Sequence, residues 1–143
     1  MGRRTLTLKG AEITTIAETP DYNLPQKCRP SAHDEATDLE IVLEGDNTVT
    51  GPDASSGGDS SSYGIHVVKS ITGTDTAPGD LLISGTGSLT VAAGTASGTN
   101  SDSFGIYVSG GVTVSGGSTV IANGGAADSR SMGIYAVSQI GTS

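Results

Sequence analysis

The stretch SDSFGIYVSGGVTVSGGSTVIANGG, from Ser101 to Gly125, decides the fold because its parts recur elsewhere in the chain. Its first part, FGIYV at 104–108, which we call the signature, is preceded by the copy YGIHV at 63–67 and followed by the copy MGIYA at 132–136. The glycines of successive copies are separated by 41 residues and then by 28. A recurring unit of this length is typical of stacked, repetitive folds. The repeat, rather than any single motif, therefore sets the expected architecture.

A second recurring part lies between these copies, and it alternates apolar and other residues before a glycine. Its three versions are Ile41/Leu43/Gly45/Val49, Leu81/Ile83/Gly85/Leu89 and Val112/Val114/Gly116/Val120. Alternation with a period of two is typical of β-strands, and spacing of the helical kind is absent over any useful length. A core unit of 28 residues with three short strands predicts an all-β parallel solenoid. A β-sandwich is the competing fold, but its hairpins would not require a fixed period.

The alternation also predicts which side chains stack inside, because successive residues of a strand point to opposite faces. Tyr63, Phe104 and Met132 have the same parity as these inward residues and are expected to close one corner of the core, whereas Gly45, Gly85 and Gly116 are expected at sharp bends. The predicted interior ladders are Ile65/Ile106/Ile134, Val67/Val108/Ala136, Leu43/Ile83/Val114 and Val49/Leu89/Val120.

We expect a single domain over residues 1–143, with departures from the repeat at three places. Residues 4–17 are interpreted as a degenerate first turn in which Leu6, Leu8 and Gly10 fit the pattern but Ile13 and Ile16 do not. Residues 18–37 contain three prolines and Cys28 and are expected to form a non-repeating loop without strands. Residues 71–80 are an insertion, and GPDASSGGDSSS and TASGTNSDS are interpreted as polar loops.

Composition and charge limit the partners. The net charge is −8 with seven Lys plus Arg, which argues against nucleic acid and anionic membranes because both require a basic surface. No apolar run is long enough to span a bilayer, and a single cysteine cannot form an intrachain disulfide. An acidic chain rich in Gly, Ser and Thr is typical of exported bacterial proteins. Because the N-terminus lacks a signal-peptide pattern, an exported protein would be represented here by a fragment or a processed form.

One candidate ligand site is an outward row formed by His66, Tyr107 and Tyr135. At the strand spacing of about 4.8 Å these rings would form a flat amphipathic strip. Such a strip suits sugar rings, whose apolar faces pack on aromatic side chains. The alternative, which we favour on the sequence alone, is that the rings stack only on one another and stabilise the fold.

A candidate metal site is the row Asp59, Asn100 and Asp128, each four residues before a copy of the signature. Oxygen ligands of this kind could hold calcium. Asp and Asn are also common turn residues because they bond to nearby backbone groups, and this is the favoured interpretation. No other cofactor is expected.

No catalytic set is predicted. His33, Asp34 and Glu35, with Asp38 and Glu40 beyond them, are the only close group of titratable residues, and a solvated polar loop is the favoured interpretation. A polysaccharide lyase or hydrolase would need convergent carboxylates on neighbouring turns, and Lys69 and Arg130 have no obvious partners. Partial hydroxyl rows, Thr48/Ser88/Thr119 and Thr50/Thr90, are too irregular for an ice-binding face because Ile121 interrupts the second row.

Over roughly residues 38–143 the segments DLEIVLEGDNTVTG, LLISGTGSLTV and GGVTVSGGSTVIANGG, with the repeated YGIHV, FGIYV and MGIYA, resemble the repeats of bacterial secreted or surface proteins of the carbohydrate-binding or adhesin-like kind. The resemblance implies a right-handed parallel β-helix, an extracellular location and binding to polysaccharide or adhesion. It carries over no catalytic residues, and residues 18–37 do not match it.

The expected protein is therefore a right-handed parallel β-helix of about four turns with three short strands per turn. We expect a non-catalytic extracellular or cell-surface module that binds polysaccharide or serves adhesion. The alternative is a fragment of a pectate-lyase-like polysaccharide-degrading enzyme. Uncapped strand edges also predict end-to-end association of copies, or truncation of a longer array.

Overall fold

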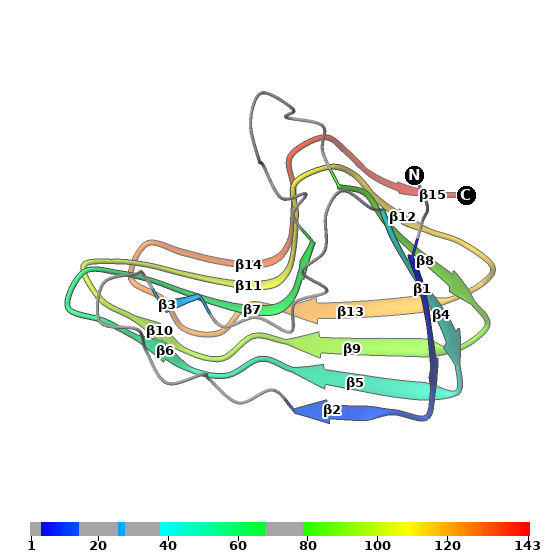
Figure 1. Cartoon of the computed structure of the whole chain (residues 1–143), viewed down its shortest axis with the longest axis horizontal. Coiled ribbons are helices and arrows are strands. Elements are labelled where there is room, and N and C mark those ends of the chain that lie inside the picture. Colours follow the sequence, from blue (N-terminus) through cyan, green and yellow to red (C-terminus); the bar gives the residue numbers. More distant parts are fainter. Residues whose placement is uncertain (1–3, 15–25, 28–37, 68–78) are drawn as a thin grey trace.

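The structure is a computed structural model, and it describes residues 4–14, 26–27, 38–67 and 79–143 (Figure 1). Within these ranges the protein contains strands and no helix, and every pairing between strands is parallel. The first sheet contains, in spatial order, β1 (Arg4–Lys9), β4 (Leu39–Glu44), β8 (Leu81–Gly85), β12 (Val112–Val114) and β15 (Ile140–Thr142).

Two further sheets and one short pair follow the same rule, in which spatial order matches sequence order. The second sheet contains β2 (Glu12–Thr14), β5 (Asp46–Thr50), β9 (Ser88–Ala92) and β13 (Thr119–Asn123). The third contains β3 (Gln26–Lys27), β7 (Asp59–Val67), β11 (Asn100–Val108) and β14 (Arg130–Ala136). The pair is β6 (Ala54–Ser55) and β10 (Ala96–Ser97). This arrangement of parallel sheets is compatible with a β-helix.

The core lies between the three sheets and is built from aliphatic side chains. Ile83, Leu89, Ile106 and Val108 are completely buried there. Several predicted ladders are confirmed, because the pairing aligns them: Ile65/Ile106/Ile134, Val67/Val108/Ala136, Ile83/Val114 and Leu89/Val120. Burying aliphatic side chains in such rows is the main source of stability available to a chain with few aromatic residues.

The predicted register is wrong by two residues where β4 and β5 meet β8 and β9. Ile83 pairs with Ile41 rather than Leu43, and Leu89 pairs with Asn47, so that Val49 pairs with Val91. The same shift places Thr48 beside Thr90 instead of Ser88. The predicted bends are confirmed, since Gly45, Gly85 and Gly116 all have positive φ angles of 70°, 102° and 71°.

Asn47 explains why this register is acceptable although it puts a polar residue inside. Its side chain is only 2% exposed. Its Oδ1 accepts a hydrogen bond from the backbone N–H of Ala11 at 2.8 Å, and its Nδ2 donates to the carbonyl oxygens of Glu44, Gly45 and Ser88 at 3.1–3.3 Å. A buried amide with all these partners costs little. The Asn47 side chain therefore connects β5 to Ala11, just before β2, on one side and to Ser88 in β9 on the other.

The strands of the third sheet bend sharply (Figure 1). Close backbone packing at the glycine of the repeated signature explains this bend. A Cβ on Gly105 would lie 2.6 Å from the carbonyl oxygen of Gly133 and 2.9 Å from the backbone N and O of Asn123. Only glycine permits such a close approach of neighbouring backbones. At the equivalent Gly64 the added atom would meet the side chain of Val91, so residue 64 faces inward, as Ile65 does. The alternation therefore slips by one residue at the bend.

This slip corrects the prediction for Tyr63, Phe104 and Met132. Tyr63 and Phe104 are buried, but neither belongs to the aliphatic core cluster. Their rings lie instead on the outer side of the bend, where that of Tyr63 stacks on His66 with centroids 4.2 Å apart. Met132, which pairs with Phe104, is 38% exposed.

The stretches interpreted as polar loops are partly strand, because buried serines satisfy their backbones. Ser62 Oγ donates to the Pro52 carbonyl oxygen at 2.7 Å and accepts from the Gly94 N–H at 2.9 Å. Ser103 repeats the pattern with Gly94 and Gly125, both at 2.8 Å. Around β6 and β10, hydrogen bonds from serine hydroxyls thus take the place of apolar packing. For this reason β7 and β11 can begin in segments that show no apolar alternation.

The N-terminal segment, described over residues 4–14, fits the repeat better than predicted. Leu8 pairs with Leu43, as expected, and Ile13, which was not expected to fit the repeat cleanly, pairs with Val49. Within 18–37, Gln26 and Lys27 form a strand beside β7, so the expectation of no strand there is wrong. Other predictions fall on residues outside the described ranges, namely Ile16, Pro20, Pro25, Cys28, Pro30, His33, Asp34, Glu35, Lys69 and most of 71–80.

Candidate functional site

The outward row predicted from the signature is present in the expected register. Tyr107 pairs with His66 on one side and with Tyr135 on the other. The Tyr107 and Tyr135 rings are stacked, with centroids 5.1 Å apart and planes inclined by 15°. His66 and Tyr107 are 5.2 Å apart and tilted by 58°. All three side chains are partly exposed.

A second aromatic row, which the sequence did not predict, lies against the first across the bend. The Phe104 ring is 5.3 Å from Tyr107 and 5.6 Å from Tyr135, and Tyr63 is 5.6 Å from Tyr107. Edge-to-face and offset contacts of this kind each add about 0.5–1.5 kcal/mol beyond the area they bury. We call these five side chains, Tyr63, His66, Phe104, Tyr107 and Tyr135, the aromatic cluster.

The aromatic cluster has a buried layer and an exposed layer. Phe104 is 1% exposed and Tyr63 7% exposed, so they form the floor. Burial raises the pKa of the Tyr63 phenol, and a hydrogen bond with Ser61 opposes this rise in part. His66, Tyr107 and Tyr135 form the layer that solvent can reach. Stabilising stacking and an accessible surface therefore exist together in the same group of rings.

An ion pair borders the aromatic cluster, and it involves Arg130, for which the sequence showed no obvious partner. Its Nε and Nη2 donate to the two carboxylate oxygens of Asp102 at 2.9 Å and 2.6 Å, and its guanidinium carbon lies 5.6 Å from the centre of the Phe104 ring. The hydrogen bonds to Asp102 raise the pKa of the arginine. Asp102 and Arg130 are register partners, each two residues before a copy of the signature, so the alignment of the repeats could have found the pair.

The predicted metal row is only partly assembled as a group of ligands. Asn100 Nδ2 donates to Asp59 Oδ1 at 3.1 Å, while the backbone N–H of Asp128 donates to Ser101 Oγ at 2.9 Å. Among the described residues, no three His, Cys, Asp or Glu side chains come together in a way that would hold a metal ion. The calcium site stays a prediction, and the interstrand hydrogen bond favours the structural role.

Asp38 and Glu40, the described part of the predicted titratable group, also bridge strands. Glu40 accepts hydrogen bonds from the hydroxyls of Ser84 at 3.1 Å and Thr5 at 3.5 Å. Asp38 accepts one from the backbone N–H of Asp80 at 3.1 Å. These carboxylates serve as acceptors between neighbouring strands.

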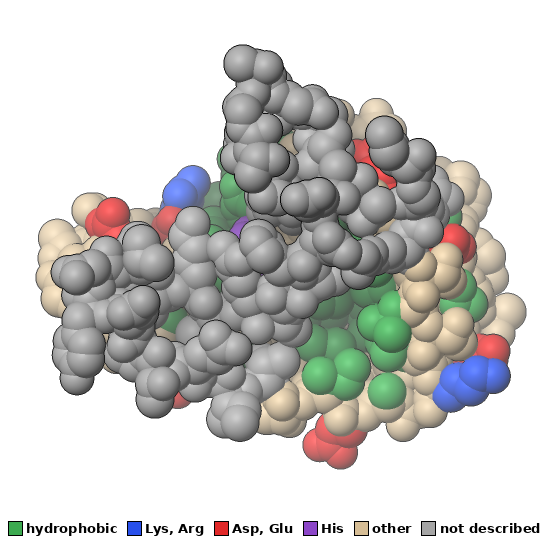
Figure 2. Space-filling view, viewed as in Figure 1, with side chains coloured by type: hydrophobic (Ala, Val, Ile, Leu, Met, Phe, Trp, Pro, Cys, Tyr) green, Lys and Arg blue, Asp and Glu red, His purple; other side chains and the backbone are tan. Residues whose placement is uncertain are grey.

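The charged side chains do not form a patch on the face shown in Figure 2. The described acidic and basic groups lie scattered around its margin, and no basic patch is seen among them. No helix in the described part of the chain is long and apolar enough to cross a bilayer.

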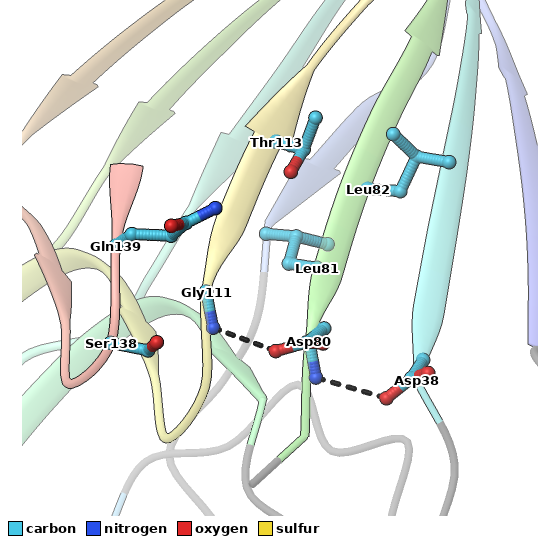
Figure 3. Close-up of a pocket in the computed structure, with 8 residues that line it drawn as sticks. All are labelled: Asp38, Asp80, Leu81, Leu82, Gly111, Thr113, Ser138 and Gln139. Carbon is cyan, nitrogen blue, oxygen red and sulfur yellow. Dashed lines mark hydrogen bonds between the residues drawn. The ribbon is translucent and has the colours of Figure 1, made fainter. Parts of the chain in front are cut away.

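A shallow cleft lies on a different sheet from the aromatic cluster, at the beginnings of β8 and β12 (Figure 3). Its volume is about 280 Å³. The lining residues come from four successive strands or the turns that lead into them: Asp38, Asp80, Leu81, Leu82, Gly111, Thr113, Ser138 and Gln139. The sequence interpretation did not identify this cleft.

Comparisons with known proteins found no matching family model, no matching curated protein and no matching solved structure.

Proposed function

We propose that the chain is a right-handed parallel β-helix of about four turns, with three short strands per turn, and that it serves as a non-catalytic module that binds polysaccharide or mediates adhesion. The order of the strands in the three parallel sheets supports the β-helix, since each sheet gains its strands in sequence order. Connections between parallel strands are right-handed in nearly all proteins. The net charge of −8 is consistent with the absence of nucleic acid among the proposed partners.

The observation that carries the binding proposal is the exposed layer of the aromatic cluster. Tyr107 and Tyr135 are nearly parallel, with centroids 5.1 Å apart. Side by side on neighbouring strands they offer a continuous amphipathic surface with phenol groups for hydrogen bonding. The rings of Tyr63 and Phe104 pack against Tyr107, and these contacts favour one orientation of its ring before any ligand arrives. A preorganised surface loses less conformational entropy on binding.

A pull-down on cellulose and on pectin tests the binding. The wild type is compared with Tyr107→Leu, which keeps an apolar side chain over Phe104 but removes the flat ring and its hydroxyl, and with Tyr135→Ala at the other end of the stack. We expect both variants to bind about tenfold more weakly, the loss expected from roughly 1.4 kcal/mol of contact energy. Binding that is unchanged in both variants contradicts the role of the aromatic cluster. Calcium-dependent release of unsaturated uronides from pectin would instead establish the lyase alternative.

We further propose an extracellular or cell-surface location and end-to-end association of copies. Exposed apolar side chains on the later strands, Ile121, Met132 and Ile140, and on Val137 just after β14, support association. Parallel sheets continue when the last strands of one copy pair with the first strands of another. Light scattering over a range of concentrations should show a rising average mass, and a constant monomer mass at high concentration contradicts association.

A further inference from the structure

The cleft on the first sheet is formed by a ladder of equivalent positions on successive strands. Asp38, Asp80, Gly111 and Gln139 occupy this ladder, each at or just before the beginning of a strand. Backbone hydrogen bonds connect the ladder: the N–H of Leu39 donates to the carbonyl oxygen of Asp80, that of Leu81 to the carbonyl oxygen of Gly111, and that of Val112 to the carbonyl oxygen of Gln139. Gly111 is the member without a side chain, and it lies between the carboxylate of Asp80 and the carboxamide of Gln139 (Figure 3). The missing side chain opens the space.

Hydrogen bonds hold the two carboxylates around this space in place but occupy only some of the acceptor atoms. Asp80 Oδ1 accepts from the Gly111 N–H at 2.7 Å, and Asp38 Oδ1 accepts from the Asp80 N–H at 3.1 Å. Each carboxylate keeps its second oxygen, Oδ2, without a hydrogen bond from a described residue. The side chains of Thr113 and Gln139 likewise make no hydrogen bond within the described ranges. The backbone bonds therefore fix the two carboxylates while leaving acceptors for a ligand.

The chemistry of the lining selects a neutral ligand with several hydroxyl groups. Two carboxylates repel anions, and hydroxyl groups donate well to carboxylate oxygens in charge-assisted hydrogen bonds. The Gln139 amide and the Thr113 hydroxyl can donate in return. Leu82, which is partly exposed, supplies an apolar contact. The volume of about 280 Å³ lies just below the usual range for small-molecule sites, which suits a ligand as small as one sugar unit.

We propose that this cleft binds a single neutral sugar residue, with Asp80 and Asp38 accepting hydrogen bonds from its hydroxyl groups and Gln139 donating to it. The cleft shares its ligand class with the function proposed above, but its residues lie outside the aromatic cluster. The two sites can therefore fail or succeed separately.

The test is a titration of the ¹⁵N-labelled protein with the methyl glycosides of glucose, galactose and mannose, followed through backbone amide signals. We expect at least one glycoside to shift the amides of Gly111 and Gln139 with a saturable curve. Asp80→Asn keeps an oxygen for the Gly111 N–H but replaces the free acceptor with a donor, and we expect affinity to fall about tenfold or more. Gln139→Ala removes an exposed side chain that makes no hydrogen bond with the described residues, and we expect the affinity for the glycoside to fall several-fold.

Asp46→Asn is the control, because the Asp46 carboxylate also accepts an interstrand hydrogen bond, in its case from the Ser88 hydroxyl at 2.7 Å, but lies on the second sheet. It should leave binding in the cleft unchanged. The absence of saturable shifts with all three glycosides overturns the proposal. Equal affinities for wild type, Asp80→Asn and Gln139→Ala also overturn it, as does binding that disappears on addition of a calcium chelator.

Discussion

Gly105→Ala tests the role of the signature glycine. The added Cβ would lie 2.6 Å from the carbonyl oxygen of Gly133 and 2.9 Å from the backbone N and O of Asn123. All three atoms belong to backbone in neighbouring strands, so no flexible side chain can move aside. We expect the strands to separate, at a cost of about 1–3 kcal/mol, as is usual when a tightly packed site is overfilled.

The change also acts on the unfolded chain, and this contribution has the opposite sign. Replacing glycine by alanine restricts the unfolded state and stabilises the folded protein by about 0.4–1 kcal/mol. Gly58→Ala isolates this term, because a Cβ at that position meets nothing within 4 Å. The difference in unfolding free energy between the two variants should therefore equal the steric cost alone.

Urea unfolding followed by circular dichroism measures both free energies. We expect a lower midpoint than wild type for Gly105→Ala and an equal or slightly higher midpoint for Gly58→Ala. Equal midpoints for the two variants would refute the close approach at the bend, and with it the explanation for the outward position of the second aromatic row.

Three further predictions concern stability, register and pH. Ser103→Ala removes two buried hydrogen bonds and should lower the unfolding free energy by about 2 kcal/mol, measured by urea unfolding; a loss below about 0.5 kcal/mol contradicts this. In a chain without its native cysteine, cysteines at Thr48 and Thr90 should form a disulfide under mild oxidation because these residues are register partners, whereas cysteines at Thr48 and Ser88 should not; the opposite result restores the register inferred from sequence. Since burial raises the pKa of Tyr63, the unfolded phenol loses its proton first above about pH 10, and stability should fall as pH rises further. Tyr63→Phe should reduce this fall, and an unchanged pH profile counts against the burial.

Much of the fold could be predicted because the signature repeats with its parity intact. Ile65, Ile106 and Ile134 share one ladder, and this follows from alternation and period alone. The register of β4 and β5 could not be predicted so directly, because Gly85-Thr86-Gly87 offers two glycines that can be matched with Gly45. Matching apolar residues favours the wrong choice, since the correct one places an asparagine beside Leu89. The four hydrogen bonds of Asn47 compensate for burying this polar side chain.

The candidate site was predicted to a similar extent. His66, Tyr107 and Tyr135 lie in the row that the alignment gave them. The floor beneath them was missed, because the alternation rule assumes a regular strand and the strand slips at its glycine. The cleft beside Gly111 was also missed, since it depends on an absent side chain in a ladder whose register is interrupted by the insertion at 71–80.

The most direct test of saccharide binding by the aromatic cluster observes the tyrosine rings themselves. Ring proton and carbon NMR signals are followed while cellotetraose, and separately tetragalacturonic acid, is added. We predict saturable shifts for Tyr107 and Tyr135 with at least one oligosaccharide, and smaller shifts for the buried ring of Tyr63. If neither oligosaccharide shifts the signals of Tyr107 and Tyr135, although the protein is retained on the parent polymer, the aromatic cluster is not the binding surface.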